Sequence, residues 1–253
     1  MNRLEGKVAI ITGAVQGIGR ACAVRVAQEG AAVVLGDLQD DDATVNEITA
    51  AGGHCARIVM DVRKRADWQR LVSAALDSYG RVDLLGNVAG VVNMHSPDNV
   101  VELTDEGWDT VLDTDLRGVW LGMQAAIPKM VQGGGGRIVN ISSLAALKGL
   151  DNLAAYSAAK AGVIGLTQQT ALEFAKDNIL VNAIAPGTID TPILADITPE
   201  MKKMNENSHM IKRLGRPSEI AGMMAFLFSG DGDFSTGLTF PVDGGWSVNG
   251  RNF

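Results

Sequence analysis

The chain has few of the residues that form metal centres, disulfides and membrane spans. Of its 253 residues, two are cysteines and three are histidines, and aromatic residues make up 5%. Cys22 and Cys55 lack the spacing of metal ligands, so we expect free thiols in a reducing compartment and no metal site. No apolar run is long enough to cross a bilayer. We therefore expect no membrane association.

Basic residues are also in the minority, with 22 Lys and Arg against 29 Asp and Glu and a net charge of -7. This charge disfavours nonspecific binding to nucleic acids and to anionic membranes. Residues 4–7 lead directly into an expected strand, so we expect no signal peptide. The sequence therefore predicts a cytoplasmic protein that acts on a small molecule.

Apolar residues make up 46% of the chain, enough for a large core. Short apolar runs alternate with helical segments, and no repeat or linker interrupts them. This alternation predicts one α/β domain over residues 1–253, with a doubly wound parallel sheet. The expected strands are 8–11, 32–36, 55–60, 82–87, 137–141, 179–185 and a last one from 236. The expected helices include 20–29, 40–51, 65–79, 104–130 with a break near Gly118, one through 154–160, and one from 216.

A glycine-rich turn at residues 12–19 joins the first strand to the first helix. Gly13 permits a tight turn, Gly17 permits close approach of the backbone to a pyrophosphate, and Gly19 permits close packing of the helix on the strand. The amino terminus of the helix then faces the phosphates. This strand–turn–helix context predicts a dinucleotide-binding site.

The second strand ends at Asp37, 18 residues beyond Gly19. A carboxylate at this position accepts hydrogen bonds from both adenosine ribose hydroxyls and repels a 2′-phosphate. No Lys or Arg occurs at residues 14–16 or directly after Asp37. The sequence therefore favours NAD over NADP.

Tyr156 and Lys160 lie four residues apart in a predicted helix, so both face the same side. A free phenol has a pKa of about 10, and lowering it to about 7 requires about 4 kcal/mol, part of which a nearby ammonium supplies. Such a phenol suits general acid–base catalysis on an alcohol or ketone. Ser143 follows the strand at 137–141, and its hydroxyl is either a donor to the substrate oxygen or a helix cap.

The segment 188–214 is irregular to helical and carries Met201, Met204 and Met210. Methionines suit an adaptable apolar wall, so we expect a substrate-binding lid here. The alternative is that they form a small apolar cluster that only packs against the core. His95 lies in the polar loop 91–101. A lone loop histidine is weak evidence for catalysis, so we assign it no role.

In combination, these segments resemble the short-chain dehydrogenase/reductase family over nearly the whole chain. The resemblance implies a seven-stranded Rossmann fold and a homo-oligomer, with a tetramer favoured over a dimer. The motifs that carry it, in the family's order, are residues 12–19, residues 87–90, Ser143, Tyr156-x-x-x-Lys160, residues 186–191 and Asp243-Gly244-Gly245.

The resemblance also implies roles for individual residues. Tyr156 would be the acid–base and Ser143 the hydrogen-bond partner of the carbonyl, while Lys160 would lower the pKa of Tyr156 and bind the nicotinamide ribose. Ile189 and Thr191 would flank the carboxamide, and Asp61 and Val62 would contact adenine. The other residues expected to bind the cofactor are Gly13, Gln16, Gly17, Ile18, Gly19, Asp37, Leu38, Asn87, Ala89, Gly90, Pro186 and Gly187.

Two features depart from the usual family pattern. The turn Asn87-Val88-Ala89-Gly90, with residues 186–192, resembles the branch containing cytosolic 3-hydroxybutyrate dehydrogenases. We do not carry that substrate over, because no arginine suited to a carboxylate lies near the expected site. Asp115 stands where the family has an Asn that holds a water in a proton relay to Lys160. We expect Asp115 to keep the relay, to favour protonated Lys160, and to move the pH optimum upward.

The leading interpretation is an NAD-dependent oxidoreductase acting on a secondary alcohol or ketone, with mildly apolar alcohols, including cyclic or steroid-like ones, as the best fit. One alternative is a 3-oxoacyl-acyl-carrier-protein reductase, which would need a basic rim for its acidic partner. The rim expected around Lys129 and Arg137 holds only those two cations. The other alternative is a catalytically impaired, cofactor-binding regulator, which only Asp115 supports.

Overall fold

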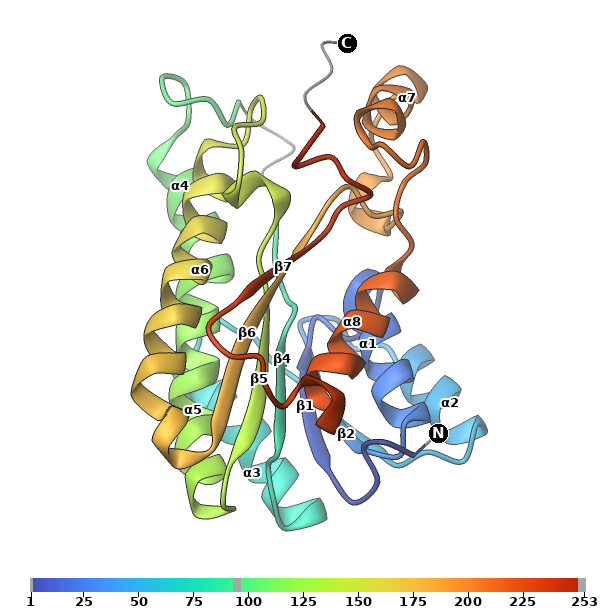
Figure 1. Cartoon of the computed structure of the whole chain (residues 1–253), viewed down its shortest axis with the longest axis vertical. Coiled ribbons are helices and arrows are strands. Elements are labelled where there is room, and N and C mark those ends of the chain that lie inside the picture. Colours follow the sequence, from blue (N-terminus) through green and yellow to red (C-terminus); the bar gives the residue numbers. More distant parts are fainter. Residues whose placement is uncertain (1, 93–96, 250–253) are drawn as a thin grey trace.

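The computed structural model describes residues 2–92 and 97–249, and its centre is one twisted sheet of seven parallel strands (Figure 1). The strand order is β3-β2-β1-β4-β5-β6-β7. This order confirms the predicted doubly wound α/β fold with a seven-stranded Rossmann-like sheet. The strands are β1 (Val8–Thr12), β2 (Ala32–Asp37), β3 (Cys55–Val59), β4 (Leu84–Asn87), β5 (Gly136–Ile141), β6 (Ile179–Pro186) and β7 (Thr239–Val242).

Helices cover both faces of the sheet, as Figure 1 shows. One face carries α1 (Gly17–Gln28), α2 (Ala43–Ala50) and α8 (Pro217–Phe228). The other carries α3 (Arg65–Tyr79), α4 (Asp105–Leu112), α5 (Gly118–Gln132) and α6 (Ala154–Phe174). Strand β1 is buried along its whole length: Ile10 packs into the core on one face, and Ile11 into the core on the other. An uninterrupted apolar run is what a strand covered on both faces requires.

The helix expected over residues 104–130 is interrupted more extensively than the sequence indicated. A π-helical turn, Asp113–Arg117, separates α4 from α5. Such turns admit an extra residue, which changes the direction of the side chains, and they are frequent at functional sites. Asp115 lies in this turn. Helix α2 also begins later than expected, because Asp40 and Asp42 pair with Arg57 of β3.

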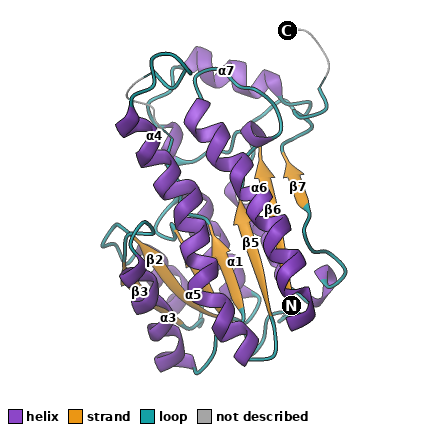
Figure 2. Cartoon of the chain, turned by 90° about the vertical axis from the view of Figure 1, so that its left-hand side faces the viewer, coloured by secondary structure: helices purple, strands orange, loops and turns teal. Residues whose placement is uncertain are grey.

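The carboxyl ends of the strands point toward α7 (Pro199–Ser208), which lies above the sheet in Figure 2. From β1 the chain continues to β2 and then β3 on one side of β1 in the sheet. Strand β4 lies on the opposite side of β1 and begins the other half of the sheet. The reversal of strand order between β1 and β4 leaves a crevice at that edge, where ligands bind in open α/β sheets. No helix in the described ranges is long and apolar enough to cross a membrane.

Gly19 provides a test of how closely α1 packs on β1. A Cβ on Gly19 would lie 2.0 Å from the carbonyl oxygen of Gly13, whereas a Cβ on Gly222 in α8 has no neighbour within 4 Å. We expect Gly19→Ala to lower the free energy of unfolding by about 1–3 kcal/mol. Gly222→Ala should instead raise it by up to about 1 kcal/mol, because alanine favours helix. Urea unfolding measures both, and unchanged stability of Gly19→Ala would contradict the close packing.

Candidate active site

A cavity of about 2110 Å³ runs along the carboxyl edge of the sheet. Its wall combines the turn after β1, the ends of β2, β4, β5 and β6, and α7. Nearly all the residues expected to bind the cofactor or to act in catalysis line it. They are Gly13, Gln16, Gly17, Ile18, Gly19, Asp37, Leu38, Asp61, Val62, Ala89, Gly90, Asp115, Ser143, Tyr156, Lys160, Pro186, Gly187, Ile189 and Thr191.

Asn87 is the exception, because its side chain turns into the core. Its Nδ2 donates to Asn140 Oδ1 at 2.8 Å, and the side chain is buried. The turn that follows is held by Thr12, whose Oγ1 accepts from the amides of Val88 and Ala89 at 3.1 and 3.2 Å. Gly13 has a φ of +64°, and a Cβ there would lie 2.9 Å from Ala89 Cα. The turns after β1 and β4 are therefore in contact, with Asn87 supporting them from the core.

The acidic residues at the ends of β2 and β3 differ in how they are held. Asp37 accepts from the amides of Val15 and Gln39, each at 3.0 Å, which fixes its carboxylate at the cavity wall. Asp61 is buried and makes a two-pronged contact with Arg63, which holds the pKa of the Asp61 carboxyl below its usual value. Arg63 is not among the residues predicted for the site, although its place two residues after Asp61 is a signal for such a pair.

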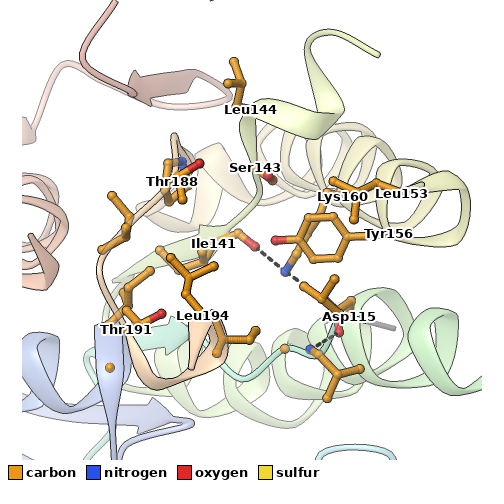
Figure 3. Close-up of a pocket in the computed structure, with 18 of the residues that line it drawn as sticks. Asp115, Ile141, Ser143, Leu144, Leu153, Tyr156, Lys160, Thr188, Thr191 and Leu194 are labelled. Carbon is orange, nitrogen blue, oxygen red and sulfur yellow. Dashed lines mark hydrogen bonds and ion pairs between the residues drawn. The ribbon is translucent and has the colours of Figure 1, made fainter. Parts of the chain in front are cut away.

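Ser143, Tyr156 and Lys160 lie together in the cavity (Figure 3). Ser143 follows β5, and the other two residues come from the first turns of α6. Lys160 Nζ donates to the carbonyl oxygen of Ile141 at 3.0 Å and lies 5.5 Å from the centre of the Tyr156 ring. Ser143 Oγ accepts from the Ala145 amide at 3.1 Å. Ser143 therefore caps a short turn and also lines the cavity, and its donation to a substrate oxygen stays a prediction.

Asp115 contacts Lys160 directly, whereas the family resemblance implied a contact through water. The Lys160 Nζ–Asp115 Oδ2 distance is 3.0 Å, and both side chains are buried. Asp115 Oδ1 also accepts from the Val91 amide at 2.8 Å. A Cβ on Gly90 would lie 2.9 Å from Asp115 Oδ2 and 3.2 Å from Lys160 Nζ. The glycine therefore leaves the space that the ion pair occupies.

These contacts determine the charges in the site. Burial raises the pKa of the Tyr156 phenol and Asp115 adds to this rise, whereas Lys160 and Ser143 oppose it. The net direction is upward, opposite to the one expected from the Tyr156–Lys160 spacing alone. Burial acts to lower the pKa of Lys160, but Asp115 and Tyr156 outweigh it and raise that pKa, so Lys160 is protonated. Burial raises the pKa of Asp115, and Lys160 opposes this rise.

The remainder of the cavity wall is largely apolar. Met201 and Met204 line it, whereas Met210 lies against Gly245, away from the cavity wall. The apolar residues near α7 and the start of α6 include Leu144, Leu150, Leu153, Ile193, Leu194 and Ile197.

The expected basic rim is wrong in position. Arg137 lies at the start of β5, where it pairs with Asp233, and neither it nor Lys129 lines the cavity. Ser143 follows the other end of the same strand. Arg137 is close to Ser143 in the chain but not in space, because the length of β5 separates them. His95 lies outside the described residues.

Comparison with known proteins adds an independent observation. Residues 13–247 match the family described as enoyl-(acyl carrier protein) reductase. The chain is 41% identical to 2,5-dichloro-2,5-cyclohexadiene-1,4-diol dehydrogenase LinX of Sphingobium indicum, over 98% of each chain. It is 40% identical to cyclohexanol dehydrogenase of Acinetobacter sp. strain SE19, over 97% of each.

A solved structure also matches the fold over nearly the whole chain. A crystal structure described as a short-chain dehydrogenase/reductase from Burkholderia xenovorans superposes with a TM-score of 0.91 at 36% identity, covering 99% of this chain and 100% of that one. Similarity of this extent, in sequence and in the order of the strands, shows common descent over the whole fold, including the part that forms the cavity. The chain therefore belongs to the short-chain dehydrogenase/reductase family of oxidoreductases.

Proposed function

We propose that the protein is an NAD-dependent dehydrogenase that interconverts a secondary, alicyclic alcohol and its ketone, with Tyr156 as the general acid–base. One observation carries the proposal: Tyr156, Ser143 and Lys160 line the same cavity as the glycine turn 13–19. An acid–base group and a dinucleotide site therefore share one space.

The cavity has the shape and the donors that a dinucleotide needs. Gln16 precedes α1 in an extended conformation, and no side chain caps the helix. The first amides of α1 are thus available to a pyrophosphate. Asp37 would accept from the adenosine ribose, Lys160 would bind the nicotinamide ribose, and Ile189 and Thr191 would flank the carboxamide. A nicotinamide held there would supply the hydride acceptor for the alcohol and the hydride donor for the ketone.

The residues of the chain itself move and stabilise the proton. In the oxidation direction, ionised Tyr156 takes the proton of the alcohol hydroxyl, and the Ser143 hydroxyl donates to the same oxygen. Protonated Lys160 stabilises the ionised phenol. Asp115 keeps Lys160 charged but opposes ionisation of the phenol, so we place the pH optimum for oxidation higher than an Asn at this position would give.

The apolar wall supports an apolar substrate, and the names of the two relatives above describe cyclic alcohols as theirs. Those names do not include the 3-hydroxybutyrate branch that residues 87–90 resemble, and we do not propose that substrate. Residues 188–214 form the substrate-binding lid in this proposal. The active form would be a cytoplasmic homo-oligomer.

The carrier-protein alternative is supported by the description of the matching family, but the charges at the cavity oppose it. Arg63 is paired with Asp61, Lys203 with Glu206, and Lys160 with Asp115. Of the cations that line the cavity in the described part of the chain, Lys148 alone has no acidic partner. One such lysine is a poor match for an acidic protein surface. The regulator alternative is opposed by the presence of Ser143, Tyr156 and Lys160 in one cavity.

Turnover of cyclohexanol and other alicyclic alcohols with NAD tests the proposal. We expect Tyr156→Phe to lower kcat by about 10²- to 10⁴-fold, because it removes the acid–base group. Tyr79→Phe, which changes the chain's other tyrosine, should keep the wild-type rate. Equal rates for wild type and Tyr156→Phe would contradict the assignment, and no turnover of any alcohol by the wild type would favour the regulator.

Fluorescence titration with NADH and NADPH tests the cofactor preference. We expect tighter binding of NADH by the wild type, because the Asp37 carboxylate would repel a 2′-phosphate. Asp37→Ala should reduce this preference by about tenfold or more, which corresponds to about 1.4 kcal/mol. Asp40→Ala is the matched control, since Asp40 is three residues away and outside the cavity wall. Tighter NADPH binding by the wild type would overturn the preference for NAD.

A further inference from the structure

His209 directly follows α7 and connects this helix to the loop after β6. Its Nδ1 lies 2.7 Å from the carbonyl oxygen of Asn205 in α7, and its Nε2 lies 3.3 Å from the amide nitrogen of Thr188. A carbonyl oxygen only accepts and an amide N–H only donates, so Nδ1 carries the proton and Nε2 accepts. Both contacts therefore require a neutral imidazole in one tautomer.

Thr188 makes a second contact with α7. Its hydroxyl donates to Asn205 Oδ1 at 3.0 Å, and Asn205 Nδ2 in turn donates to the carbonyl oxygen of Met201 at 2.9 Å. Thr188 lies between Gly187 and Ile189, which line the cavity where we place the nicotinamide. His209, Thr188 and Asn205 thus form a closed set of hydrogen bonds between α7 and this loop.

The His209 ring also fills a narrow space between two turns. A Cβ on Gly187 would lie 2.8 Å from Nε2, and one on Gly244 would lie 3.2 Å from Cδ2. The Trp246 ring packs edge-on against the imidazole at 5.0 Å between centroids. The side chain of His209 is almost completely buried. The ring cannot change position unless one of these turns moves with it.

We propose that His209 is a positioning residue that holds α7, and with it the Met201 and Met204 wall of the cavity, on the cofactor loop 187–191. It does so only while its ring is neutral, because a proton on Nε2 would face the Thr188 N–H and break that contact. Binding of cofactor and alcohol would then weaken in mild acid. The claim about binding rests on the proposed function, whereas the contact between α7 and the loop does not.

The surroundings of His209 set the pH range. Burial opposes protonation of the ring, as do the cations Arg213 and Lys212, whereas the Asn205 carbonyl and the Asp243 carboxylate favour it. Burial is the largest effect, and the pKa of His209 lies below its ordinary value. The stabilisation that the neutral ring provides is therefore complete above the ordinary histidine pKa of about 6.5 and is lost progressively as the pH falls below it.

Three variants separate this role from simple packing. His209→Gln keeps an acceptor near the Nε2 position but cannot titrate. His209→Asn keeps a donor near the Nδ1 position and loses the acceptor. His54→Gln is the matched control, because His54 is exposed and directly precedes β3, at the opposite edge of the sheet from β6 and β7. Circular dichroism and thermal unfolding check that each variant folds.

The measurements are hydrogen exchange of the segments 187–191 and 199–208 in the protein alone, and the Kd for NADH, from about pH 8 to about pH 5. In the wild type and in His54→Gln, we expect the backbone amides of both segments to lose protection from exchange in acid. The Kd for NADH should rise about threefold to tenfold over the same range. His209→Gln should show flat profiles. His209→Asn should be weakened at every pH.

Two results would overturn the proposal: acid loss in His209→Gln equal to that of the wild type, or wild-type protection of the two segments that is independent of pH. The second result needs no variant, so a failure of the variants to fold leaves the test intact. Exchange in the protein alone also separates this inference from the proposed function. If the protein turns over no alcohol but its backbone amides exchange with the expected pH dependence, only the proposed function is refuted.

Discussion

The buried ion pair between Lys160 and Asp115 is the contact on which the arrangement of the active site depends. Removing one partner of a buried pair leaves an unpaired charge and costs about 3–5 kcal/mol. Lys160 also donates to the carbonyl of Ile141 at the end of β5, and Asp115 accepts from the Val91 amide after β4. The pair therefore joins α6, the π-helical turn and the ends of two neighbouring strands at the point where Tyr156 faces the cavity.

The same pair has opposing effects on Tyr156, the proposed acid–base. Lys160 favours the ionised phenol of Tyr156, whereas burial and Asp115 disfavour it. A site with Asp115 keeps its lysine protonated over a wide pH range, but it loses part of the effect of that lysine on the phenol. Such a balance suits oxidation of an alcohol under alkaline conditions. Gly90 is necessary for it, because any side chain there would displace one member of the pair.

Local patterns in the sequence predicted most of the fold and much of the candidate site. The apolar runs, the glycine turn and the Tyr156–Lys160 spacing depend on neighbours within a few residues, and the structure places these segments as expected. The direct contact of Asp115 with Lys160 depends on a π-helical turn and joins two residues that are 45 positions apart in the chain. The inward direction of Asn87 and the remote position of Arg137 also depend on three-dimensional arrangement. Periodicity in the sequence carries no information about these.

Ultraviolet titration of the Tyr156 phenol tests most directly whether the ion pair controls the acid–base. The chain has two tyrosines, so Tyr79→Phe leaves Tyr156 as the only phenol. In that background, Asp115→Asn should lower the pKa of Tyr156, because it removes a buried negative charge beside the phenol. Asp113→Asn, at a half-exposed position of the same turn, should leave that pKa unchanged. Equal titration curves with and without Asp115 would show that the pair has no control over the phenol and would contradict the account.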